Sequence, residues 1–189
     1  MLNTGGGLPE NTATNLALQA GIWNPATNKW TQGSAETKGR EYHSIALLLP
    51  DATVLVAGGG APGPVNQLNA EIYYPPYLYA KDGSETRLSR PVIKSAPQDM
   101  TMGSTYNMTV TSQKAIKRVT LVRTGSVTHS VNVDQRFLEV PFVQSGTNLQ
   151  VNVNETNNVL PPGYYMVIAI DTVGVPTVAK IVRIGIRLA

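Results

Sequence analysis

Residues 54–60 read Val-Leu-Val-Ala-Gly-Gly-Gly, a short apolar segment that ends in three glycines. A weaker copy, Leu-Asn-Thr-Gly-Gly-Gly, occupies residues 2–7, about 50 residues earlier. Each copy is followed by a polar loop and then by a segment that ends in proline. These segments are Ala-Gly-Ile-Trp-Asn-Pro at 20–25 and Ala-Glu-Ile-Tyr-Tyr-Pro at 70–75. The repeat predicts two similar β-units, one after the other, in the first part of the chain.

The spacing of this repeat indicates the kind of β-unit. Glycines after one strand and an aromatic residue at the end of another, every 50 residues or so, are typical of kelch-type propeller blades. A residue without Cβ lets strands crowd together where they converge. Trp30, after a polar turn, is expected to anchor the first blade. A ring needs about 4–8 blades, so residues 1–87 are interpreted as part of an incomplete propeller. The remaining blades are expected on the same parent polypeptide or on another chain.

From residue 88 onward the pattern changes to short segments in which apolar and polar residues alternate. Turn residues separate these segments at the spacing of a β-sandwich. An immunoglobulin-like domain of about 100 residues fits residues 88–189. No strong amphipathic helix is predicted, so the fold class is all-β. The expected sandwich strands lie at 106–111, 119–123, 136–140, 149–153, 164–170 and 178–184.

Composition excludes several classes of protein. The chain has 189 residues, of which 42% are hydrophobic and 14% charged, with a net charge of +3. This weak, scattered positive charge does not indicate a nucleic acid or an acidic membrane as partner. The absence of cysteine excludes disulfides and thiol chemistry. No apolar run approaches the length of a membrane helix, about 20 residues, and no signal peptide is visible after Met1.

Two histidines, His43 and His129, are the candidates for metal chemistry. His43 precedes an apolar run at 45–49, and His129 lies between two expected sandwich strands. Their separation matches no metal-ligand motif, so spacing alone favours ordinary hydrogen-bonded or surface histidines.

Longer motifs around these histidines change that interpretation. They are Tyr-His-Ser-Ile-Ala-Leu-Leu-Leu-Pro-Asp at 42–51, the glycines at 58–60, Thr-His-Ser-Val-Asn-Val-Asp-Gln-Arg at 128–136 and Leu-Pro-Pro-Gly-Tyr-Tyr-Met at 160–166. In this order they resemble the C-terminal part of the copper-radical oxidases, the family of galactose oxidase and glyoxal oxidase. The resemblance extends from about residue 40 to the C-terminus. It implies the last blades of a seven-bladed kelch propeller, followed by an early-set immunoglobulin-like domain whose hairpin delivers a histidine to copper.

The resemblance also implies roles for three residues. His43 and His129 are similar to the two imidazole ligands of copper, and Tyr42 is similar to the axial tyrosine that accepts the proton of the substrate hydroxyl. Imidazole and phenolate are suitable ligands for Cu(II), and a bound cation favours the phenolate. Neighbouring residues of a regular strand point to opposite faces. Tyr42 and His43 can therefore share one metal only if the backbone there is irregular.

One departure from the family concerns its radical cofactor, a tyrosine cross-linked to a cysteine. This chain has no cysteine, so the resemblance places that cofactor in blades upstream, and the chain alone is expected to be inactive. The implied parent is a secreted oxidase that converts primary alcohols or aldehydes, carbohydrates included, with O2 and releases H2O2. The alternative is a non-catalytic kelch and immunoglobulin-like protein that binds carbohydrates or a surface. A third possibility is a truncated piece of a longer protein, whose function is a property of the parent only.

Overall fold

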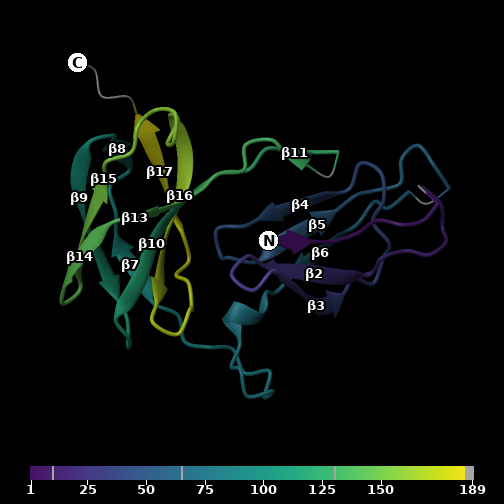
Figure 1. Ribbon diagram of the computed structural model, residues 1–189, viewed down its shortest axis with the longest axis horizontal. Coiled ribbons are helices and arrows are strands. Elements are labelled where there is room, and N and C mark those ends of the chain that lie inside the picture. The colour runs from purple at the N-terminus through teal and green to yellow at the C-terminus, as the bar shows by residue number, and fades with distance from the viewer. Residues whose placement is uncertain (10, 65, 130, 186–189) are drawn as a thin grey trace. The chain divides into compact units, whose positions relative to one another are not determined.

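The computed structural model describes residues 1–9, 11–64, 66–129 and 131–185. The chain divides into two compact units (Figure 1). Unit 1 consists of Met1–Leu49, Thr53–Pro76 and Gly125–Val133, and unit 2 of Pro50–Ala52, Tyr77–Thr124 and Asp134–Ala189. Ser130, which belongs to the motif at 128–136, lies outside the described residues. No helix in the described part is long and apolar enough to cross a membrane.

Unit 1 contains two antiparallel three-stranded sheets. The first has the order β1 (Leu2–Asn3), β2 (Gln19–Asn24), β3 (Lys29–Ala35), and the second has the order β4 (Ile45–Leu48), β5 (Val54–Ala57), β6 (Ala70–Tyr73). The repeat seen in the sequence is visible here, because β1 and β5 each run into a glycine triplet and each pairs with the next strand. Trp30 is 54% exposed. It is therefore not a buried anchor, and its ring lies over Gly21.

A small hairpin completes unit 1, although its sequence lies between two strands of unit 2. It pairs β11 (Val127–Thr128) with β12 (Val131–Asn132). Both strands lie beside β4 (Figure 1). The backbone amide of Ser126 donates to the side-chain oxygen of Asn132 at 3.1 Å, and that of Val133 donates to the Ser126 carbonyl at 3.0 Å. These bonds close the base of the hairpin and direct His129 to its tip.

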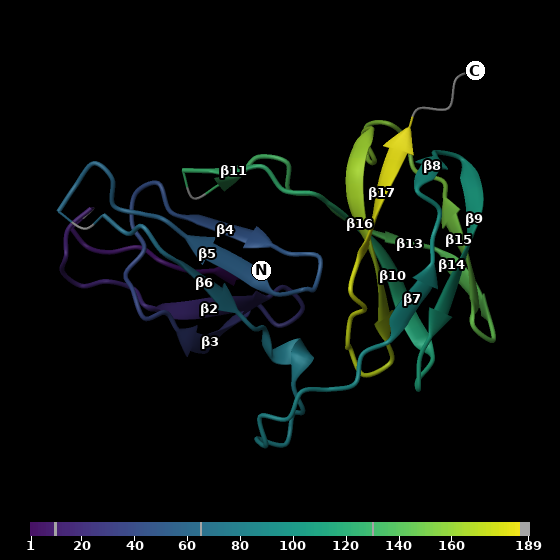
Figure 2. The same cartoon turned by 180° about the vertical axis from the view of Figure 1, so that it is seen from behind.

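Unit 2 is a two-sheet sandwich (Figure 2). Its five-stranded sheet has the order β13-β10-β16-β17-β8 and its four-stranded sheet the order β14-β15-β9-β7. A short 3-10 helix, η1 (Pro76–Leu78), covers the point in the sequence where a segment of unit 1 ends at Pro76 and unit 2 resumes at Tyr77. The strands are β7 (Val92–Ser95), β8 (Asp99–Thr101), β9 (Ser104–Thr111), β10 (Ile116–Arg123), β13 (Phe137–Val140), β14 (Phe142–Ser145), β15 (Asn148–Val153), β16 (Gly163–Asp171) and β17 (Lys180–Gly185).

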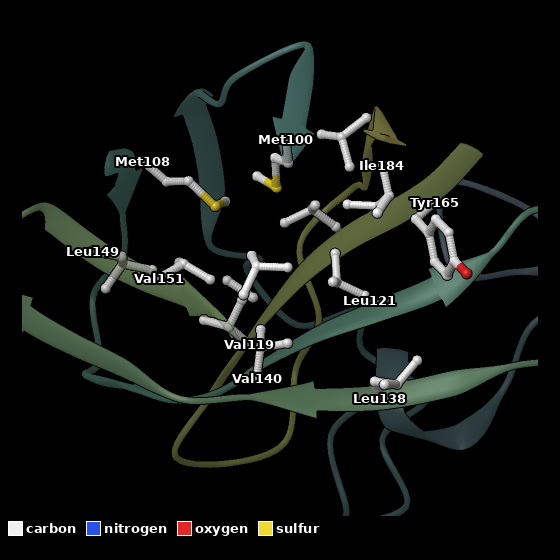
Figure 3. Close-up of a cluster of buried hydrophobic side chains, with 14 of the residues drawn as sticks. Met100, Met108, Val119, Leu121, Leu138, Val140, Leu149, Val151, Tyr165 and Ile184 are labelled. Atoms are coloured by element: carbon white, nitrogen blue, oxygen red, sulfur yellow. The ribbon is translucent and has the colours of Figure 1, made fainter. Parts of the chain in front are cut away.

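The core of unit 2 lies between its sheets and follows the strand period of two. In β15, Leu149, Val151 and Val153 are fully buried, and the residues between them are more exposed. They meet apolar side chains of the facing sheet, with Met100 and Met108 filling the space at one end (Figure 3). The core includes Val119, Leu121, Val140, Tyr165, Val167 and Ile184. Such burial is the main stabilising term of a sandwich.

The prediction of an all-β chain that ends in an immunoglobulin-like sandwich is confirmed. The first part of the chain forms two separate sheets, and the described residues contain no closed propeller.

Candidate metal centre

The structure brings together the three side chains singled out in the sequence, all within unit 1. The ring centroids of His43 and His129 lie 4.3 Å apart, with the ring planes at 75°. The Tyr42 ring lies 3.8 Å from the His43 ring and 5.9 Å from the His129 ring. All three side chains are exposed on unit 1. Residues far apart in the sequence thus form one cluster of two imidazoles and a phenol.

The backbone of both histidines is unusual. His43 has φ 66° and His129 has φ 49°, values in the left-handed region that few residues other than glycine adopt. The turn at His43 follows directly after Tyr42, so the backbone there is not a regular strand and the two neighbouring rings can lie on one side. Left-handed backbone at non-glycine residues costs free energy and is concentrated at functional sites.

Each histidine has one ring nitrogen in a hydrogen bond. His43 Nδ1 lies 2.8 Å from the carbonyl oxygen of Ala61, which can only accept, so this nitrogen carries the proton. His129 Nδ1 lies 2.7 Å from the hydroxyl oxygen of Thr128. Metal-binding histidines commonly make such a bond with the nitrogen that does not bind the metal, and the bond fixes the ring orientation. Nε2 of each ring is therefore the nitrogen suited to a metal.

The donor set fits copper. Two imidazole nitrogens and a phenol oxygen are nitrogen and oxygen ligands of the kind that Cu(II) takes. In the described part of the chain, no three side chains of the His, Cys, Asp and Glu types gather into a metal site. Tyr42 is the third side chain of this cluster that carries a donor atom.

Glycines hold the backbone of residues 40–44 in place. A Cβ on Gly59, which has φ +118°, would lie 2.9 Å from the Glu41 nitrogen and 3.2 Å from the Ser44 Cβ. The Gly60 amide donates to the Tyr42 carbonyl at 2.6 Å. In the first triplet, the Gly6 amide donates to the Arg40 carbonyl at 2.6 Å. Both glycine triplets thus contact residues 40–44, the segment that includes Tyr42 and His43.

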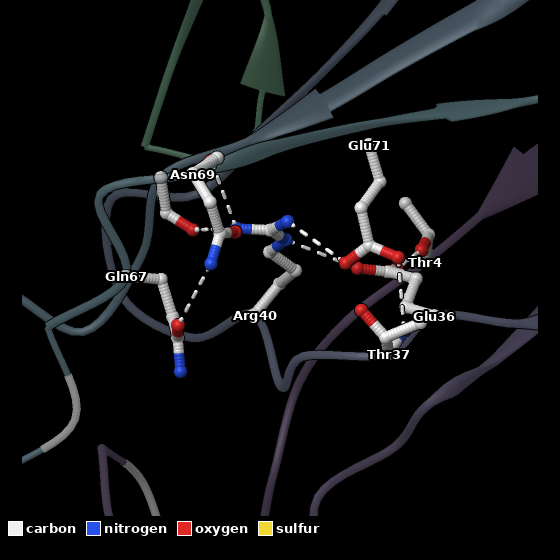
Figure 4. A network of polar contacts seen from close by, with 8 residues as sticks. Thr4, Glu36, Thr37, Arg40, Gln67, Asn69 and Glu71 are labelled. Atoms are coloured by element: carbon white, nitrogen blue, oxygen red, sulfur yellow. Dashed lines mark hydrogen bonds and ion pairs between the residues drawn. The ribbon is translucent and has the colours of Figure 1, made fainter.

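Arg40 is the buried centre of this segment, with a relative exposure of 0%. Its Nε lies 3.2 Å from Glu36 Oε2 and its Nη2 lies 3.0 Å from Glu71 Oε1. Its Nη1 donates to the carbonyls of Gly58 and Asn69, both at 3.1 Å. Figure 4 shows this network. The guanidinium group therefore has an acceptor for each of its three nitrogens.

The two glutamates of the network differ in their electrostatics. Burial raises the pKa of Glu36, and the positive charge of Arg40 only partly offsets this effect. The Thr37 backbone amide donates to Glu71 Oε2 at 2.9 Å. This bond, together with Arg40, lowers the pKa of Glu71. Glu71 is thus the more firmly ionised partner of Arg40.

Glu41 is a second buried charged residue of the segment, and its relative exposure is 6%. Among the described residues, neither of its carboxylate oxygens has a hydrogen-bond partner. Sequence reasoning missed the burial of Arg40 and Glu41. A signal was available, because four charged residues, at 36, 38, 40 and 41, directly precede Tyr42 in a chain with 14% charged residues.

Known proteins resemble this chain over most of its length. Residues 90–184 match the family described as galactose oxidase-like, early set domain. A galactose oxidase of Gibberella zeae is 34% identical over 167 residues, which are 86% of this chain and 24% of that protein. The aldehyde oxidase GLOX of Vitis pseudoreticulata is 30% identical over 164 residues, 78% of this chain and 30% of that protein.

A solved structure gives the same result. It is described as a fungal alcohol oxidase of the AA5 family in complex with copper, and it is 33% identical with a TM-score of 0.87. The match covers 97% of this chain and 39% of that one. The chain thus spans 24% to 39% of the length of these relatives. The resemblance found in the sequence is confirmed. The family match at residues 90–184 covers half of the sequence, and the chain therefore belongs to the galactose oxidase-like early set domain family.

Proposed function

We propose that this chain is the copper-ligating C-terminal part of an oxidase of primary alcohols or aldehydes. For an alcohol the overall reaction is RCH2OH + O2 → RCHO + H2O2. The alcohol loses two electrons and two protons, and O2 gains both. The meeting of Tyr42, His43 and His129 is the observation that carries this proposal.

The roles of these residues follow from their chemistry. Nε2 of His43 and Nε2 of His129 would hold the copper, and the Tyr42 oxygen would complete the set. Copper, when bound, supplies one-electron redox chemistry and favours the phenolate of Tyr42. The Tyr42 oxygen accepts the hydroxyl proton of the alcohol as a general base. Because Tyr42 is 42% exposed, a small substrate can reach its side chain within unit 1.

Several parts of this activity would come from outside these 189 residues. A tyrosine–cysteine radical cofactor needs a cysteine, and the sequence has none. We propose that kelch blades outside this sequence carry it, together with most of the substrate pocket. In this reading the two sheets of unit 1 are kelch blades, and the enzyme is secreted. The names of the relatives support alcohols, aldehydes and sugars such as galactose as the substrate class.

The experiment is a Cu(II) titration of the chain followed by electron paramagnetic resonance. The expected result is a tetragonal signal with hyperfine coupling to two nitrogens. It should be lost in His43→Ala and in His129→Ala, which remove the two histidines of the chain. Tyr42→Phe should keep the nitrogen coupling and change the spectrum. The matched control is Tyr164→Phe, because Tyr164 is an exposed tyrosine of unit 2.

The outcomes separate the proposal from its alternative. A signal that depends on both histidines supports the oxidase. A signal that both histidine variants retain would refute the copper site and would favour a non-catalytic binding protein.

A further inference from the structure

Arg40 makes more directed hydrogen bonds than a purely stabilising ion pair needs. A buried ion pair adds little net stability, because the cost of removing the charges from water offsets their attraction, and apolar replacements are often as stable. Arg40 is nevertheless fully buried and bound to four acceptors, Glu36, Gly58, Asn69 and Glu71. Its planar, branched guanidinium fixes the direction of each bond. The network is therefore suited to fixing the position of the backbone around Arg40 more than to adding net stability.

The position that it specifies is that of the ligand pair. Arg40 stands two residues before Tyr42 and three before His43. Its acceptors come from both repeats of unit 1. Glu36 follows β3, whereas Glu71 lies in β6 and Gly58 directly follows β5. The guanidinium thus fixes the start of residues 40–44 relative to the strands of both sheets.

The rest of the segment is held at its far end. The Ser44 amide donates to the Glu41 carbonyl at 2.9 Å, and the Gly60 amide donates to the Tyr42 carbonyl at 2.6 Å. Between these bonds lies the left-handed backbone of His43. A strained residue keeps its conformation only when the surrounding structure determines it, and here Arg40 provides the upstream constraint.

We propose that Arg40 is a positioning residue of the metal centre, which holds Tyr42 and His43 where they meet His129. It contacts neither metal nor substrate and acts through the backbone of residues 40–44. This inference rests on the proposed function, because it assumes that the cluster binds copper.

The test compares two variants of the full chain with the parent. Arg40→Lys keeps the charge but removes the branched geometry. Glu71→Gln keeps the shape and removes one charge, at a side chain that is 25% exposed. The control is Arg118→Lys, the same exchange at an exposed ion pair with Glu139 in unit 2. Both tryptophans lie in unit 1, so their fluorescence reports whether unit 1 has folded.

The expected result is a Cu(II) dissociation constant about 10- to 100-fold higher in both folded variants, the range for residues behind metal ligands. The hyperfine coupling should also change, and Arg118→Lys should match the parent. Folded variants with the parent's affinity and spectrum would overturn the positioning role and leave the copper site intact. Unfolding of both variants would assign the network to stability, and would also overturn it. A parent without a histidine-dependent signal would refute the proposed function itself, and this inference with it.

Discussion

The close approach of Gly59 to residues 40–44, which carry Tyr42 and His43, makes Gly59→Ala a sharp perturbation. Its new Cβ would lie 2.9 Å from the backbone nitrogen of Glu41, 3.2 Å from the Ser44 Cβ and 3.4 Å from the Arg40 Cα. Two of these atoms belong to the backbone and cannot turn aside as a flexible side chain would. Either residues 40–44 or the glycine turn must therefore move.

Two costs add in this variant. The φ of +118° is unfavourable for an L residue and costs about 1–3 kcal/mol. The overpacking costs about another 1–3 kcal/mol. We expect unit 1 to lose roughly 2–6 kcal/mol of unfolding free energy, and the Cu(II) affinity to fall because Tyr42 and His43 move with the segment.

Gly6→Ala is the matched control. Gly6 has a similar φ of +108°, but a Cβ there would meet nothing within 4 Å. It carries the backbone cost without the collision, so the difference between the two variants isolates the contact with residues 40–44. Urea unfolding followed by tryptophan fluorescence measures unit 1, since Trp23 and Trp30 both lie there. If Gly59→Ala is no less stable than Gly6→Ala and binds Cu(II) as tightly, the packing argument is wrong.

Two further predictions concern the carboxylates of unit 1. The pKa of Glu71 is lowered in the fold by the Thr37 amide and Arg40, so its stabilising contribution is present above about pH 4.5 and is lost as the pH falls through the lowered pKa. Glu71→Gln should therefore reduce the slope of the unfolding free energy against pH on the acid side, as measured by urea unfolding at a series of pH values. A slope equal to that of the parent would contradict this. Glu41→Met should raise the unfolding free energy of unit 1 by about 1–3 kcal/mol, because it removes a buried carboxylate without a hydrogen-bond partner. A fall in calorimetric stability would instead mean that an internal water or cation satisfies the carboxylate.

The strands that the sequence predicts correctly are those with clear periodicity. The segment 149–153 became β15 (Asn148–Val153), and 164–170 became β16 (Gly163–Asp171). The missed strands are short and half polar, such as β7 (Val92–Ser95) at a sheet edge and β14 (Phe142–Ser145) directly after a proline. Four residues with polar ends carry too little alternation to distinguish a strand from a loop.

The candidate site was predictable only in part. Neither periodicity nor spacing could join His43 to His129, because their proximity depends on a hairpin that packs beside β4. The family resemblance supplied that pairing. The burial of Arg40 was not predictable, because charged side chains are rarely buried fully and its acceptors lie on strands and turns whose packing one sequence does not reveal. The backbone strain at the two histidines likewise becomes visible only in three dimensions.

The distribution of Arg40's partners has a consequence for how this chain can be divided. Glu36 belongs to the first repeat and Glu71 to the second, and the exposed residues Thr37 and Lys38 lie between Glu36 and Arg40. Tyr42 and His43 thus follow a residue whose partners come from both repeats, and neither repeat contains the whole network. A cut after Lys38 would separate the two carboxylates onto different fragments. Under the proposed function, copper binding would then report the reassembly of the halves, and recombination that exchanges one repeat alone would abolish it.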